Sequence, residues 1–62
     1  MNRIAISKRT ALKMFFDVGY NTDLLLKIAL IQVEALKQAA NGYYYADDVV
    51  ASIQEAESLL NN

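Results

Sequence analysis

The fold of this chain is decided by residues 22–40, which read TDLLLKIALIQVEALKQAA. This stretch contains no glycine or proline, and residues with high helix propensity dominate it. Its polar positions form one narrow stripe on a helical wheel, made by Asp23, Lys27, Glu34, Lys37 and Gln38. A helix at the surface of a protein usually shows one apolar stripe instead. We therefore predict one helix over residues 22–40 that other elements cover on most of its sides.

The size and composition of the chain favour self-association. Its 62 residues allow one domain at most, so we take residues 1–62 as a single helical domain, of which 55% is hydrophobic. Cysteine and histidine are absent, so neither disulfides nor thiolate or imidazole metal sites can stabilise the fold. Small domains without such supports commonly associate. We therefore expect a homodimer or a higher oligomer.

Gln32 lies roughly opposite the charged stripe, in the middle of the apolar surface of the predicted central helix. A buried amide needs hydrogen-bond partners. Gln32 can therefore bond a backbone carbonyl or its symmetry mate, and in the second case it would fix the register of a helix pair. Contact with a ligand is the alternative. The residues that we assign to the oligomer interface are Leu25, Ile28, Gln32 and Leu36.

Two further helices are predicted at residues 8–18 and 46–60, where apolar residues recur at helical spacing. Two of the predicted helices begin near side chains that can cap a first helical turn. Ser7 or Thr10 can cap the first helix, and Asn21 or Thr22 can cap the central helix. Gly19 and Asn41-Gly42 suit the ends of these helices. The predicted fold class is all-α, with helices at about 8–18, 22–40 and 46–60 in a small bundle that oligomerisation completes.

A short extended arm precedes the first helix. Residues 3–7 alternate between polar or small residues and isoleucine, so Ile4 and Ile6 would share one face of a strand. Such a strand has no evident partner in so short a chain unless a second subunit supplies one. The alternative is an arm whose two isoleucines fill the core.

The residues needed for most kinds of catalysis are missing. The chain offers no histidine as a general base, no cysteine as a nucleophile and no glycine-rich phosphate loop. Asp47 and Asp48 are adjacent on a helix and point in different directions, so they make a poor acid–base pair. We therefore predict that the protein is not an enzyme and takes no cofactor or metal.

Charge is polarised along the chain although the net charge is only −1. The first thirteen residues carry four cations and the last twenty carry four carboxylates. These ends are either two solvated faces, or a basic end that contacts a phosphate or an acidic partner, or the two ends of an antiparallel dimer. The start resembles no signal peptide and residues 24–33 are too short to span a bilayer, so we expect a cytoplasmic protein without membrane contact.

Three consecutive tyrosines, Tyr43, Tyr44 and Tyr45, follow the central helix. They either cover the end of the bundle or form a binding surface, because tyrosine is enriched at interfaces. We assign them to the binding of an unidentified protein partner. The predicted function is therefore a small, homo-oligomeric interaction module, an accessory, regulatory or inhibitory protein of the kind found in phages, plasmids and bacteria.

A second function is suggested by residues 3–7, RIAIS, and residues 19–30, GYNTDLLLKIAL. The order of arm, helix, turn and apolar helix resembles that of ribbon-helix-helix repressors. The resemblance implies a strand that pairs across a dimer and lies in the major groove of DNA. The residues that it would place against DNA are Arg3, Ala5 and Ser7 at the bases, and Asn21 and Thr22 at a phosphate. A helix-turn-helix is less favoured, because residues 24–36 lack the polar face of a recognition helix.

Overall fold

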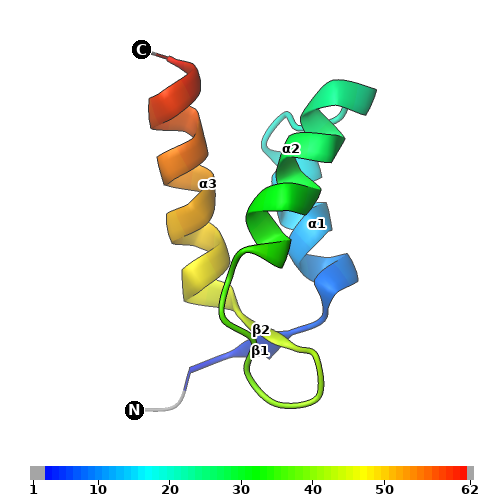
Figure 1. The fold of residues 1–62 in the computed structure, drawn as a ribbon, viewed down its shortest axis with the longest axis vertical. Coiled ribbons are helices and arrows are strands. Elements are labelled where there is room, and N and C mark those ends of the chain that lie inside the picture. Colours follow the sequence, from blue (N-terminus) through cyan, green and yellow to red (C-terminus); the bar gives the residue numbers. More distant parts are fainter. Residues whose placement is uncertain (1–2, 62) are drawn as a thin grey trace.

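The computed structural model describes residues 3–61, which form three helices and a short two-stranded antiparallel sheet (Figure 1). The elements follow in the order β1 (Ala5–Ile6), α1 (Lys8–Asp17), α2 (Asp23–Glu34), β2 (Tyr44–Tyr45) and α3 (Ala46–Leu60). The protein is therefore mostly helical, as predicted, and the third helix has the predicted bounds. The sheet is an addition to the predicted all-α class.

Side-chain caps set the beginnings of the first two helices. The hydroxyl of Ser7 accepts a hydrogen bond from the Thr10 amide at 3.1 Å, and that of Thr22 accepts one from the Leu25 amide at 3.3 Å. Both bonds satisfy amides that the first helical turn leaves free. Gly19 follows α1 with a φ of 115°, a backbone conformation that favours glycine. These boundaries confirm the predicted caps.

The central helix ends at Glu34, six residues before its predicted end at residue 40. Asn41 and Gly42 have φ values of 58° and 76°, and two successive positive values are typical of a tight hairpin turn. The Tyr43 amide closes this turn by donating to the Ala40 carbonyl at 3.1 Å. Asn41-Gly42 therefore turns a hairpin, in which Gln38 pairs with Tyr44, and does not end a helix.

Strand β1 pairs with β2 of the same chain, with Ala5 opposite Tyr45 and Ile6 opposite Tyr44. The expectation that only a second subunit could supply a partner for this strand is therefore wrong. The pairing continues into α3, because the Ala46 amide donates to the Ile4 carbonyl at 2.8 Å. The N-terminal arm is thus fixed against the start of α3.

The core lies where the three helices meet above the sheet, and its largest fully buried side chains are those of Phe15, Val33 and Val49. Helix α2 contributes Ala29 and Val33 from one side only. Its opposite side leaves Leu24 69% exposed and Ile31 63% exposed. We had expected other elements to cover α2 on most of its sides. Within one chain they cover only the side that faces the core.

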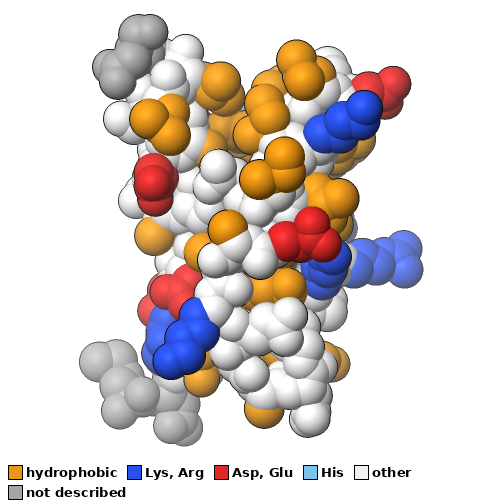
Figure 2. Space-filling view, in the orientation of Figure 1, with side chains coloured by type: hydrophobic (Ala, Val, Ile, Leu, Met, Phe, Trp, Pro, Cys, Tyr) orange, Lys and Arg blue, Asp and Glu red, His pale blue; other side chains and the backbone are white. Residues whose placement is uncertain are grey.

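Helix α3 diverges from α1 and α2 toward its C-terminal end, away from the sheet (Figure 1). Figure 2 shows hydrophobic side chains on the upper parts of α2 and α3, on either side of an open notch. Leu59 and Leu60, in the last turn of α3, are 63% and 54% exposed. This end of α3 therefore presents apolar side chains that its own chain does not cover.

Tyr20, in the turn between α1 and α2, joins these helices to α3. Its ring packs edge-on against Phe15 with centroids 5.2 Å apart, and only 4% of Tyr20 is exposed. The hydroxyl is buried without a hydrogen-bond partner among the described residues. Burial raises the pKa of Tyr20, and the negative charge of Glu57 raises that pKa further. The neutral phenol is therefore the form that the folded state favours.

We expect this phenol to weaken the fold at high pH. Below about pH 10 Tyr20 is neutral in the folded and unfolded states, whereas above it the unfolded chain ionises and the folded protein retains the proton. Stability should therefore fall as the pH rises from about 10 toward the raised pKa. Urea denaturation across this range checks the fall, which Tyr20→Phe should reduce without loss of stability at neutral pH. An unchanged alkaline fall in Tyr20→Phe would contradict this role.

Candidate functional site

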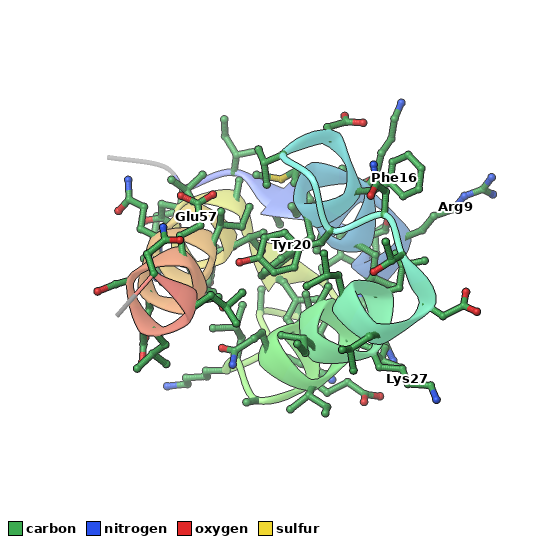
Figure 3. All side chains as sticks on the ribbon, turned by 90° about the horizontal axis from the view of Figure 1, so that it is seen from above. Arg9, Phe16, Tyr20, Lys27 and Glu57 are labelled. Atoms are coloured by element: carbon green, nitrogen blue, oxygen red, sulfur yellow. The ribbon has the colours of Figure 1, made fainter. Side chains whose placement is uncertain are left out.

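An open groove of about 540 Å³ lies between α1 and α2. Its size falls within the range of about 300–1,000 Å³ that is usual for ligand pockets. Its lining combines an apolar floor with charged residues at the rim: Arg9, Thr10, Leu12, Lys13, Phe16, Asp17 and Leu26. Figure 3 shows Arg9 and Phe16 on the side of the molecule away from α3. We call this feature the α1–α2 groove.

Helix α1 positions the aromatic and the two cations of the groove. Phe15 is fully buried, and because adjacent helical residues point about 100° apart, Phe16 turns toward solvent and is 48% exposed. Lys13 lies one turn from both Arg9 and Phe16 on the same helix, at spacings of four and three residues. An exposed aromatic ring therefore lies beside two cations along one face of α1.

The cations of the groove are not neutralised within the described residues. The ion pairs within residues 3–61 involve other cations. Lys8 pairs with Glu34 at 2.8 Å, and Arg3 pairs with Asp47 at 2.9 Å and with Asp48 at 2.8 Å. The hydrogen bond from Arg3 lowers the pKa of Asp47 below its ordinary range. The groove cations Arg9 and Lys13 form no ion pair within residues 3–61, nor do Glu55 and Glu57 of α3.

The three tyrosines assigned to partner binding lie in different environments. Tyr43 is 46% exposed, whereas Tyr44 is 3% exposed and belongs to the core. The Tyr44 hydroxyl accepts a hydrogen bond from Gln38 at 3.4 Å. Tyr45 is half-buried, with the Arg3 guanidinium 3.8 Å from the centre of its ring. The structure therefore removes Tyr44 from the candidate surface, and binding through Tyr43 and Tyr45 stays a prediction.

The residues assigned to an oligomer interface face the interior of the same chain. Leu25, Ile28 and Leu36 are partly buried and pack against the core. Gln32 is half-buried and accepts a hydrogen bond from the Ser52 hydroxyl of α3 at 3.4 Å. Gln32 thus contacts α3 of its own chain, and an oligomer interface through these four residues stays a prediction. The apolar residues that α2 exposes to solvent are Leu24, Leu30 and Ile31.

The five residues that the ribbon-helix-helix resemblance placed against DNA are not brought together. Arg3 pairs with Asp47 and Asp48, Ala5 lies in β1, and the Ser7 hydroxyl caps α1. Asn21 and Thr22 lie in the α1–α2 turn, at the end of the molecule opposite the sheet (Figure 1). Moreover, β1 pairs within the chain, where the resemblance requires pairing across a dimer.

The α1–α2 groove was not predicted from the sequence, although the order of residues in α1 carried two signals of it. Adjacent residues on a helix point about 100° apart, so the pair Phe15-Phe16 allows one ring to face the core while the other faces solvent. The spacing of Arg9 and Lys13 was a second signal, since residues four apart share a helix face. Together these spacings predict an aromatic and cationic surface.

Comparisons with protein-family models, with curated proteins and with solved structures found no match to this chain. Within residues 3–61, no three acidic side chains gather closely enough to hold a metal ion. None of the helices in the described part of the chain is long and apolar enough to cross a membrane. The function of the α1–α2 groove must therefore be argued from its own chemistry.

The different burial of Tyr43 and Tyr44 can be tested by replacing each tyrosine with alanine. We expect Tyr44→Ala to lower the free energy of unfolding by about 3–5 kcal/mol, as other large aromatic deletions in cores do. Tyr43→Ala should change it by no more than about 0.5 kcal/mol, because this side chain is half exposed. Urea denaturation of both variants measures the difference, and equal losses would contradict the burial of Tyr44.

Proposed function

We propose that the protein is a non-enzymatic protein–protein interaction module that binds its partner through the α1–α2 groove. The observation that carries this proposal is the exposed ring of Phe16 on an apolar floor, beside the unpaired cations Arg9 and Lys13. Aromatic residues and arginine are enriched among the residues that contribute most to protein interfaces. The module would act as a small accessory, regulatory or inhibitory protein of phage, plasmid or bacterial type.

The exposed apolar surface of α2 supports a protein partner over a small ligand. Leu24, Leu30 and Ile31 are exposed on the helix that forms one wall of the groove. Large apolar side chains exposed on one helix are more typical of a protein interaction site than of a small-ligand pocket. The same surface supports the proposal that the protein is a homo-oligomer. Action in the cytoplasm is part of this proposal.

We expect Phe16→Ala to weaken partner capture by about tenfold or more, because loss of a central aromatic anchor commonly has this effect. The measurement is the amount of partner retained from a lysate of the source organism on the immobilised protein. Ile4→Ala is the matched control, since Ile4 is 71% exposed and lies outside the groove. Equal capture by wild type and Phe16→Ala would count against the groove.

A second candidate function is binding of DNA. Helices α1 and α2 are joined by a short turn that contains Gly19, and residues 38–45 then form a hairpin. Consecutive helices joined in this way occur in helix-turn-helix proteins. Arg9, Lys13 and Lys27, which form no ion pairs within residues 3–61, supply cations for phosphate contacts. The apolar exposed face of α2 makes this the second choice, because recognition helices read bases with polar side chains.

DNA binding predicts that random duplex DNA is retarded in a gel at low salt and less so at moderate salt, because phosphate contacts release counterions. Lys27→Glu should weaken the retardation, whereas Glu55→Gln, on the acidic helix α3, should not. Duplex DNA that remains unshifted at low salt would eliminate this candidate.

A further inference from the structure

We propose that the α1–α2 groove binds the C-terminal end of α3 from a second copy of this chain. The protein would then assemble head to tail, through two different surfaces. This inference rests on the proposed function, because it names the partner of the same groove. It differs from the interface predicted at Leu25, Ile28, Gln32 and Leu36, where the side chains are partly buried within their own chain.

The end of α3 has the features of a segment that docks elsewhere. Leu59 is 63% exposed and Leu60 is 54% exposed, although both are large apolar residues. Glu55 lies one helical turn before Leu59, and Glu57 lies three residues before Leu60, so each carboxylate is next to a leucine on the helix surface. The segment thus combines two leucines with two carboxylates that form no ion pair within residues 3–61.

The groove presents the complementary set of groups. Its apolar residues are Leu12, Phe16 and Leu26, and its unpaired cations are Arg9 and Lys13. Burial of the leucines against this floor would supply the affinity, because removal of apolar surface from water drives association. The opposite charges at the rim would set the orientation of the helix and speed its association.

The acidic groups nearer the start of α3 do not compete for the groove. Asp47 and Asp48 are already paired with Arg3 of their own chain, at 2.9 and 2.8 Å. The carboxylates left for a second copy are therefore those at the C-terminal end, beside the exposed leucines. Asp17 is the one acidic residue in the groove lining, so the two cations give the lining a net positive charge.

The positions of the two surfaces decide the kind of assembly. The end of α3 and the α1–α2 groove lie on different sides of the molecule, so α3 cannot reach the groove of its own chain (Figures 1 and 3). A contact between two different surfaces is heterologous and builds closed rings or open chains, in contrast to the self-complementary contact of a two-fold dimer.

Sedimentation of charge-reversal variants tests the contact. The wild type should sediment above its monomer mass of 6.9 kDa at micromolar to millimolar concentration, and less so at high salt. The variants Arg9→Glu/Lys13→Glu and Glu55→Lys/Glu57→Lys should each associate about tenfold more weakly or worse, because each places like charges across the contact. An equimolar mixture of these two double variants should recover assembly, since the groove of each variant is then opposite in charge to the α3 end of the other.

A matched control separates this contact from the effect of net charge. Lys27→Glu/Lys37→Glu changes the net charge as much as Arg9→Glu/Lys13→Glu but alters residues outside the groove lining. This control should assemble as the wild type does, and thermal unfolding followed by circular dichroism should show that all variants fold. Equal weakening in the control, or no recovery in the mixture of variants, would overturn the proposal.

The experiment also separates this inference from the proposed function. A wild type that stays at 6.9 kDa throughout would overturn the second copy as occupant. If Phe16→Ala still reduced partner capture in that case, the groove would belong to a different protein and the proposed function would stand. If Arg9→Glu/Lys13→Glu instead abolished retardation of duplex DNA, the occupant would be nucleic acid.

Discussion

The rest of the structure depends on the pairing of Tyr44 on both of its edges. Its backbone lies opposite Ile6 on one side and Gln38 on the other, and its ring enters the core. The first pairing fixes the residues that lead into α1, and the second fixes the chain that leaves α2. Because α3 begins directly after β2, this small sheet sets the position of all three helices in the described chain. The helices are therefore held together at the sheet, and the buried Tyr20 joins them again from the α1–α2 turn.

This arrangement also decides which side chains remain for binding. The sheet end uses Arg3 for ion pairs with α3 and Tyr44 for the core. In the last turn of α3, Leu59 and Leu60 are more than half exposed. The outer side of α1 is not covered either, which leaves Phe16 beside unpaired cations. The candidate surfaces thus lie where neither the sheet nor the core covers the helices.

The sequence predicted those features that depend on neighbouring residues and missed those that depend on distant ones. The caps Ser7 and Thr22 and the bounds of α3 follow from local chemistry, and the structure confirms them. Residues 35–40 have the composition of a helix, but the Asn41-Gly42 turn and the pairing of Tyr44 draw them into a hairpin. A tertiary contact therefore overrides helix propensity here. Asn-Gly before a run of tyrosines is itself a hairpin signal, although it also suits the end of a helix.

The excess of apolar residues in α2 predicts that this protein needs a partner, but it does not locate the interface. One side of the helix serves the core through Ala29 and Val33, and Gln32, which was assigned to the interface, accepts a hydrogen bond from Ser52 of its own chain. Apolar surface is not directional, so exposure alone would allow several contacts. Charge is more selective, because like charges across a contact disfavour the wrong partner. Among the exposed apolar surfaces, the groove has unpaired cations and the end of α3 has unpaired carboxylates within residues 3–61. That complementarity is the reason to assign these two surfaces to each other.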